Sequence, residues 1–414
     1  MKLRSRTLAV IVGAALAAGT LTACSAGSES GVTTISYYSW WNQKSVQPMV
    51  DEFEKENPKI KIDLSAAQGA SADYTQTLTT RMSGGQEPDV FHLSTDTFKQ
   101  LTDGGYVRDI TNEPFMKSID PAAKSLYTKD GKVYGMSPTA WAGAIIYNKD
   151  LLKKAGYSSV PTTFDEFLTM GKKLKSMGVT PYMEAPASAS GSFQPMLGGY
   201  YAKQGDEEND TAIYDGKTTF SEAWTPLLKQ WNELVTSGVL PKDVVGVNAD
   251  QIKQEFMTGQ LAMYRSGPWD FTDLDSSGVK YSAAPFPALK GGEPFIGGGP
   301  DSPYAISSKI SGAKLKAAEK FLAFANSAEG LKIASKNLQV ISTSSEYDTK
   351  VPAQLKEVYT DYLKPGKYYW LNFPAGATTM SQEMIAEWQL LIQGKATPAE
   401  VTAALDQKWA TVKK

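Results

Sequence analysis

The stretch DGKVYGMSPTAWAGAIIYNKDLLKKAGYSSVPTTFDEFLTMGKKLKSMGVTPY, residues 130–182, contains the signals that decide the expected fold. Asp130 and Gly131 are residue types that accept the positive φ angles of a tight hairpin turn. Residues 142–147 (AGAIIY) form a continuous small-to-apolar run, which indicates a strand buried on both faces. The sequence Thr-Phe-Asp-Glu at residues 163–166 is the pattern of a capping box, and it predicts a helix that ends before Gly178.

Outside this stretch, strand and helix patterns alternate along the first third of the chain. Residues 33–39 are rich in β-forming types, residues 46–53 carry an apolar helical stripe, and residues 60–64 alternate as a strand. A second helix over residues 74–83 is followed by a strand at residues 90–93. This alternation predicts an α/β fold with a parallel sheet.

Three segments give the chain a specific resemblance. They are AIIYN at residues 144–148 (followed by Leu152 and Lys154), FMTGQLAMYRSGPWDF at residues 256–271, and SGGQEPDVF with LTDGGYVRDIT in the first third. Together they make the chain similar to family 1 extracellular solute-binding proteins of carbohydrate ABC transporters, such as maltose- and oligosaccharide-binding lipoproteins. The resemblance covers almost all of the chain after the N-terminal segment.

The resemblance implies a two-lobed, type II periplasmic-binding-protein-like fold, with a mainly parallel sheet flanked by helices in each lobe and a hinged cleft between the lobes. The expected N-terminal lobe comprises residues 33–141 and 300–348, and the C-terminal lobe comprises residues 142–299 and 349–414. Crossings between the lobes are expected near residues 140–143, 297–301 and 344–352.

The N-terminal residues indicate export. Basic residues at 2, 4 and 6 precede an apolar run at residues 8–21, which is shorter than the roughly 20 residues of a membrane span. The sequence Leu-Thr-Ala-Cys then ends at Cys24, the only cysteine, which excludes an internal disulfide. We expect a signal peptide at residues 1–23, lipidation of Cys24 and a flexible stalk at residues 24–32; the alternative is a buried free thiol.

The composition of the chain and the absence of known catalytic motifs argue against several classes of function. The 42 basic and 44 acidic residues give a net charge of −2, and the chain has no basic run beyond its N-terminus, which argues against nucleic acid. The only histidine, His92, lies in a predicted buried strand. Motifs of serine hydrolases, zinc proteases and P-loop enzymes are absent. We therefore expect no enzyme, no cofactor and no metal, although two carboxylates could still serve a glycoside hydrolase. A surface scaffold is a third class.

A sugar-binding site needs aromatic faces for C–H groups and planar polar groups for hydroxyls. The cluster Trp40, Trp41 and Asn42 follows the first strand, where α/β folds place ligands. Adjacent side chains diverge, so the two tryptophans cannot both face one core; either at least one lines the cleft or both pack structurally. Trp269 lies in a Gly-Pro-Trp turn that projects its ring. The remaining candidates are Asp96, Trp141, Glu184, Gln194, Asp270, Asp301 and Trp370.

For two of these candidates the resemblance supplies the expected role. Asp96 matches a position at which relatives carry an acceptor for sugar hydroxyls, with a helix N-cap as the alternative. Glu184 follows a strand where maltose-binding relatives place a sugar-binding acid. The resemblance further implies a mono- or oligosaccharide ligand, ABC permease subunits as partners, a lipid anchor on the outer face of the cell membrane, and a monomer. Acids outnumber bases among the candidates, which favours a neutral or oligomeric glycan over a phosphorylated or uronic one.

Overall fold

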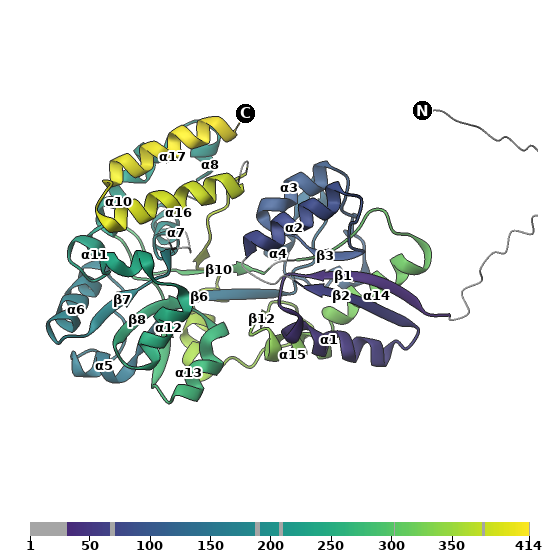
Figure 1. Ribbon diagram of the computed structural model, residues 1–414, viewed down its shortest axis with the longest axis horizontal. Coiled ribbons are helices and arrows are strands. Elements are labelled where there is room, and N and C mark those ends of the chain that lie inside the picture. Colours follow the sequence, from purple (N-terminus) through teal and green to yellow (C-terminus); the bar gives the residue numbers. More distant parts are fainter. Residues whose placement is uncertain are drawn as a thin grey trace, which may run out of the picture.

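The computed structural model describes residues 31–66, 71–186, 191–206, 210–301, 303–374 and 377–413. The predicted signal peptide and Cys24 lie outside the described residues. Figure 1 shows two lobes side by side, joined by the long strand β6 (Thr139–Asn148) and its neighbour β10 (Ile296–Pro300). The two-lobed α/β fold expected from the sequence is confirmed.

The first lobe is built on a sheet in the order β11-β3-β1-β2. Its strands are β1 (Thr33–Ser39), β2 (Ile60–Ala66), β3 (Val90–His92) and β11 (Tyr304–Ile306). β1 pairs in parallel with β2 and β3, whereas β11 returns from the second lobe and pairs antiparallel with β3. The parallel sheet predicted from the alternating pattern is confirmed here, with an antiparallel strand at one edge.

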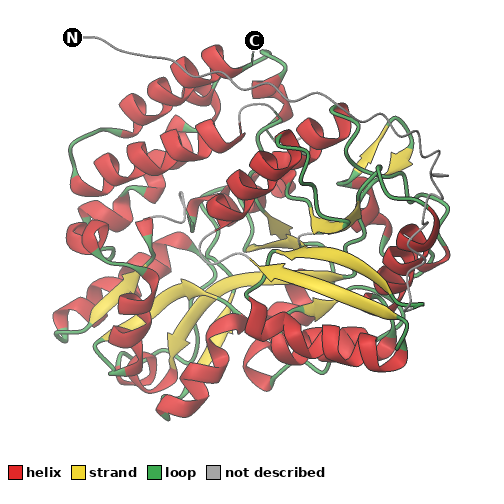
Figure 2. Cartoon of the chain, turned by 45° about the vertical axis from the view of Figure 1, so that its right-hand side comes forward, coloured by secondary structure: helices red, strands yellow, loops and turns green. Residues whose placement is uncertain are grey.

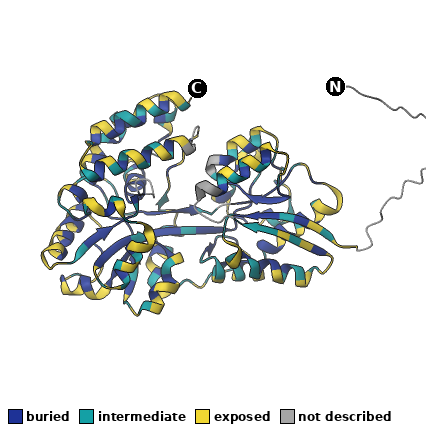
Figure 3. Cartoon of the chain, in the orientation of Figure 1, coloured by how far each residue is buried: buried dark blue, intermediate teal, exposed yellow. Residues whose placement is uncertain are grey.

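Helices cover both faces of this sheet because successive side chains of β1 point to opposite sides. Ile35 and Tyr37 pack in one buried cluster and Tyr38 packs in another. The helical segments of this lobe are α1 (Gln43–Glu56), α2 (Ser71–Ser83), α3 (Thr95–Asp103), η1 (Pro114–Met116), α4 (Pro121–Ser125), α14 (Gly312–Ala325) and α15 (Ala328–Asn337). In Figure 3 the outer faces of these helices are exposed; β3 and the second half of β1 are buried, whereas β2 at the edge of the sheet is largely not.

The predicted hairpin is present as β4 (Thr128–Lys129) and β5 (Lys132–Val133). Asp130 and Gly131 have φ angles of 51° and 74°, the left-handed conformation that this turn requires.

The second lobe is built on a sheet in the order β13-β10-β6-β8-β7, with β9 and β12 also paired to β6. Its further strands are β7 (Thr180–Met183), β8 (Leu261–Ser266), β9 (Tyr281–Ala284), β12 (Ile341–Ser342) and β13 (Tyr368–Tyr369). The expectation of a mainly parallel sheet is wrong for this lobe. β6 is antiparallel to β8, β9, β10 and β12 because it enters from the first lobe, against the direction of the strands around it. Only β7–β8 and β10–β13 are parallel.

Helices surround this second sheet, as Figure 2 shows in red around the yellow strands. They are α5 (Lys149–Lys154), α6 (Phe164–Ser176), α7 (Phe193–Gln204), α8 (Thr211–Tyr214), α9 (Phe220–Ala223), α10 (Thr225–Trp231), α11 (Glu233–Thr236), α12 (Ala249–Met257), α13 (Phe271–Ser277), α16 (Ala377–Gln393) and α17 (Pro398–Val412). The 3-10 helices η3 (Lys242–Gly246), η4 (Pro268–Asp270) and η5 (Ala353–Leu355) and the π-helical η6 (Val358–Leu363) complete the lobe. Among the described residues, no helix is long and apolar enough to cross a membrane.

The helix α6 begins where the sequence predicts, but its capping differs. The Thr163 side chain makes no hydrogen bond to the backbone; its Oγ1 donates instead to Glu166 Oε2 at 3.1 Å. The predicted capping box is therefore incomplete. The burial of Phe164, Phe167 and Leu174 confirms the apolar face of this helix.

Candidate functional site

Three tryptophans from distant parts of the chain come together where β6 passes from the first lobe into the second. The Trp141 ring centroid lies 6.4 Å from that of Trp269 and 5.1 Å from that of Trp370. Trp269 is 45% exposed and Trp370 is 39% exposed, whereas globular proteins usually cover rings of this size. We call Trp141, Trp269 and Trp370 the tryptophan trio. All three were predicted site residues, and the fold brings them to one place.

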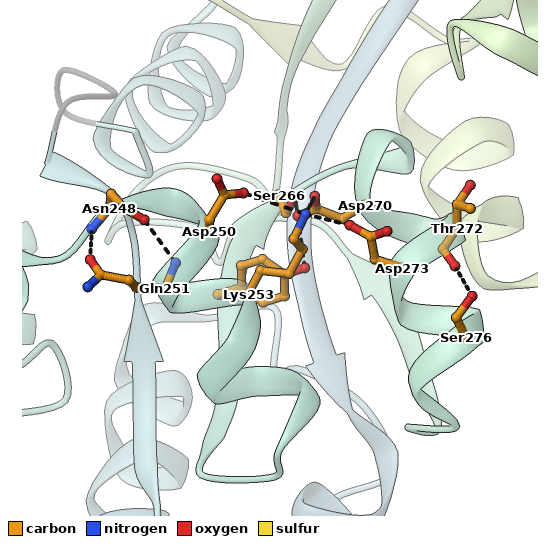
Figure 4. Close-up of polar contacts among 10 residues, drawn as sticks. Asn248, Asp250, Gln251, Lys253, Ser266, Asp270, Thr272, Asp273 and Ser276 are labelled. Atoms are coloured by element: carbon orange, nitrogen blue, oxygen red, sulfur yellow. Dashed lines mark hydrogen bonds and ion pairs between the residues drawn. The ribbon is translucent and has the colours of Figure 1, made fainter.

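The turn that carries Trp269 is held by its neighbour Asp270. Asp270 Oδ2 accepts hydrogen bonds from Tyr264 Oη at 3.0 Å and from Ser266 Oγ at 2.5 Å, and Lys253 Nζ lies 3.3 Å from Oδ1. Figure 4 shows Lys253 of α12 reaching Asp270 and also Asp273. The predicted ligand residue Asp270 is therefore engaged within the lobe, where it fixes the end of β8 and the start of η4.

Trp370 is anchored through the residues on either side of it. The Leu371 N–H donates to Gln194 Oε1 at 2.9 Å, so the predicted ligand residue Gln194 is buried and braces the chain after β13. On the other side, Tyr369 Oη donates to the buried carboxylate of Asp210 at 2.5 Å. The chain on either side of Trp370 is thus tied to two buried side chains, Gln194 and Asp210.

Asp210 is the centre of this second anchor. Besides Tyr369, its carboxylate accepts from Tyr201 Oη and from Trp224 Nε1, the latter at 2.9 Å. Burial raises the pKa of Asp210 above its ordinary value, although these three hydrogen bonds oppose the shift.

A cation accompanies the trio. The Arg265 guanidinium carbon lies 5.6 Å from the Trp370 ring centroid, within the range of a cation–π contact.

Glu184 is 2% exposed and accepts hydrogen bonds from Tyr182 Oη at 2.6 Å and from the Ser192 N–H at 2.9 Å. Burial raises the pKa of Glu184, while these two hydrogen bonds and the charge of Arg265 oppose the increase.

Trp40 and Trp41 lie in the first lobe and diverge as predicted. Trp40 packs edge-on against Tyr74, with ring centroids 5.0 Å apart, and Trp41 packs edge-on against His92 at 4.7 Å. Both tryptophans remain partly exposed. Asn42 caps α1, since its side-chain oxygen accepts from the Ser45 N–H at 3.0 Å.

His92 is the satisfied core histidine that the sequence predicts, fully buried, with Nε2 2.7 Å from Tyr37 Oη. Asp96 is the second residue of α3, and the N-cap of that helix is Ser94, so the alternative role of Asp96 as N-cap is wrong. Asp301 lies between β10 and β11, where its N–H donates to the Thr139 oxygen at 2.8 Å.

A separate cavity of about 840 Å³ lies behind the crossing strands. Ala140 of β6 lines it, whereas the next residue, Trp141, belongs to the trio; neighbouring side chains of a strand point to opposite faces. The other lining residues come from α4, β12, η6, from Pro300 of β10 and Tyr368 of β13, and from the segments beside these elements. We take the trio, rather than this cavity, as the candidate site because the trio combines exposed aromatic rings with a cation. A large volume alone does not indicate what a site binds.

Sequence reasoning missed Arg265. It lies inside the segment MYRSGPWDF that carries part of the resemblance, but a single charge in a strand usually marks a solvated face. Its closeness to Trp370, 105 positions further along the chain, follows from the tertiary structure alone.

Comparison with known proteins identifies the family of this chain. Residues 40–332 match the model of the family described as "Bacterial extracellular solute-binding protein". The chain belongs to this family. It is 44% identical to a family 1 extracellular solute-binding protein from Bifidobacterium longum subsp. infantis, whose structure superposes with a TM-score of 0.80 over 92% of this chain and 100% of that one.

Two curated relatives extend the comparison. The multiple sugar-binding protein of Streptococcus mutans serotype c is 26% identical over 323 residues, which cover 73% of each chain. The maltooligosaccharide ABC transporter solute-binding lipoprotein of Streptococcus pneumoniae serotype 4 is 23% identical over 379 residues, covering 87% of this chain and 86% of that protein. Both relatives are named as binding proteins, so the chain is a solute-binding protein by family.

Proposed function

We propose that the chain is the substrate-binding component of an ABC sugar importer, which takes up a mono- or oligosaccharide between its lobes and delivers it to a membrane permease. The observation that carries this proposal is the tryptophan trio, in which Trp269 and Trp370 stay 45% and 39% exposed although both pack against Trp141.

The chemistry of the trio suits a sugar. One face of a pyranose presents C–H groups that pack on an aromatic ring, while its edge carries hydroxyls that need donors and acceptors. Rings held at an angle of 49° between Trp141 and Trp269, and of 83° between Trp141 and Trp370, offer apolar faces in different directions. A bent oligosaccharide could use more than one of them. The names of the two curated relatives agree with this class of ligand.

The lobes that would enclose the ligand are residues 33–141 with 300–348, and residues 142–299 with 349–414. This division is supported by the buried clusters, since residues from 35 to 136 pack with residues 304–340. The site would then gain Trp40, Trp41, Asn42 and Asp96 from the first lobe when the lobes close. Closure that buries the ligand is the signal that a permease can distinguish.

Anchoring belongs to the same proposal. Cleavage before Cys24 and lipidation of its thiol would hold the protein at the outer face of the cell membrane, close to the permease. Attached acyl chains would provide stable binding without a membrane-spanning helix. The pneumococcal relative is named as a lipoprotein, which supports this step.

Isothermal titration calorimetry of the mature protein with maltotriose, raffinose, xylotriose and chitotriose tests the proposal. We expect saturable 1:1 binding of at least one sugar, with a matching rise in melting temperature because the ligand binds only the folded state. Chromatography of the recovered sugar separates a receptor from a glycosidase: a receptor returns the sugar unchanged. Cleaved products, or no saturable binding by any of the four, would contradict the proposal.

A further inference from the structure

Arg265 is placed beside the tryptophan trio by an interior strand. It lies in β8 opposite Ile145 of β6, so its backbone is fixed within the sheet. Gly191 makes room for its side chain, because a Cβ at that glycine would lie 2.7 Å from Arg265 Cδ and 3.1 Å from its Nε. The guanidinium then extends over the Trp370 ring. The position of this cation is therefore determined by the fold rather than by a flexible surface side chain.

One donor of this guanidinium, Nε, is not used within the described part of the lobe. Nε is enclosed and donates to no acceptor among the described residues. The residue as a whole is partly exposed. Buried donors without acceptors are rare and costly in folded proteins. Because Nε is itself enclosed, a ligand would bring its acceptor oxygens to the other N–H groups of the guanidinium.

Glu184 supplies the opposite charge from behind. A Cβ at Gly191 would lie 3.5 Å from Glu184 Oε2, so this carboxylate and the Arg265 side chain flank the same glycine. The charge of Arg265 opposes the burial-driven rise in the pKa of Glu184, and the charge of Glu184 likewise opposes the fall in the pKa of Arg265 that burial causes. The pair presents donors at the site with little net charge.

We infer that Arg265 is a ligand-binding residue, which donates from its planar guanidinium to two adjacent oxygens of a neutral sugar ring lying against Trp370, with Glu184 as its buried counter-charge. This inference rests on the proposed sugar-binding function. The fork of N–H groups matches two neighbouring acceptors, a geometry that the single ammonium of lysine does not reproduce. A neutral sugar is favoured over an anionic one because Glu184 already compensates the cation.

The first test compares Arg265→Met and Arg265→Lys with the wild type, by calorimetry with maltotriose, raffinose, xylotriose and chitotriose. We expect both variants to weaken the best of these sugars roughly ten- to a hundred-fold, the loss of hydrogen bonds from a charged donor. Lys309→Met is the matched control: it also removes a cation over an aromatic ring, that of Tyr106, but lies after β11 beside the start of β3. Its affinity should equal that of the wild type.

Because Arg265→Met leaves Glu184 without its counter-charge, that variant could fail to fold. The double variant Arg265→Met/Glu184→Gln removes both charges and should bind as weakly as Arg265→Met. If it binds like the wild type, Arg265 is not a ligand residue. A wild type that binds none of the four sugars overturns the proposed function itself, a result distinct from equal binding by wild type and variants.

Digalacturonate tests the charge balance. The wild type should bind this acidic sugar more weakly than the best of the four neutral ones. Tighter binding of digalacturonate would overturn the role of Glu184 as counter-charge.

Discussion

Trp269 and Trp370 expose large parts of their rings, while Trp388, a side chain of the same size, is 1% exposed. This difference in exposure distinguishes tryptophans that are available to bind a ligand from one that packs in the core. Truncation of an exposed ring that covers a ligand removes contacts made only in the complex. Truncation of a buried ring leaves a cavity in the folded protein.

We predict that Trp269→Ala and Trp370→Ala each weaken sugar binding by about 1–3 kcal/mol, from the loss of one large apolar contact, which is roughly ten- to a hundred-fold in Kd. Their melting temperatures without ligand should stay near that of the wild type. Trp388→Ala should instead lose about 3–5 kcal/mol of unfolding free energy. Calorimetric titration beside thermal melts separates the cases, and unchanged binding with a large fall in melting temperature would assign Trp269 or Trp370 to the core.

Asp210 provides a prediction about pH. Its pKa is raised, so the folded protein holds this proton more tightly than the unfolded chain does. The stability from this group is therefore complete below the ordinary Asp pKa of about 3.9 and is lost as pH rises toward the folded-state pKa. Asp210→Asn does not titrate, so its melting temperature relative to the wild type should increase between pH 4 and pH 7. A difference that is constant, or that falls with rising pH, would refute the assignment.

At the scale of the element, the turn from β8 into η4 places Trp269. Gly267 begins this turn, and a Cβ there would lie 2.6 Å from the Ala142 carbonyl oxygen of β6 and 2.3 Å from the Trp269 ring. The backbone of β6 cannot move without disturbing the pairing of β6 with β8 and β10. The glycine therefore allows the turn to approach the strand that carries Trp141.

We predict that Gly267→Ala lowers both the melting temperature and the sugar affinity, because the turn must shift away from β6 and move the Trp269 ring. Overpacking of this kind costs about 1–3 kcal/mol. Gly246→Ala is the matched control, since a Cβ at Gly246 would meet nothing within 4 Å. If both variants melt and bind alike, the close approach at Gly267 has no bearing on the site.

At the scale of the whole molecule, the proposed export and lipid anchoring would decide where the protein works. We predict that Cys24→Ala is released into the medium or remains as an uncleaved precursor, because the thiol that would carry the lipid is gone. Immunoblots of cell and medium fractions measure this. Ser25→Ala, which keeps the cysteine, should remain with the cells, and a normally processed, cell-attached Cys24→Ala protein would mean that something else holds it.

Local chemistry in the sequence was sufficient for several elements and for the fold class. Asp130-Gly131 form their turn, the apolar run around Ile145 forms a buried strand, and residues 144–148 with residues 256–271 carry a family likeness that the family model confirms. These features depend on neighbours along the chain, so a pattern of a few residues contains them. The aromatic candidates were also identified from the sequence. Trp269, for example, is indicated by its place in a Gly-Pro-Trp turn.

The tertiary structure decided what each candidate does. Three candidates have side chains of the types that bind sugar hydroxyls, yet they form hydrogen bonds within the protein. Gln194 bonds to Leu371, Asp270 to Ser266 and Asn42 to Ser45. Arg265 was not among the sequence candidates, yet its guanidinium lies over Trp370. The direction of β6 against its neighbours was equally hidden. For Gln194, Arg265 and β6 the physical reason is the same: the partner lies more than 100 positions away in the chain, and only folding determines which distant groups meet. Asn42 and Asp270 instead bond to groups three and four positions away, and these local contacts were not read from the sequence.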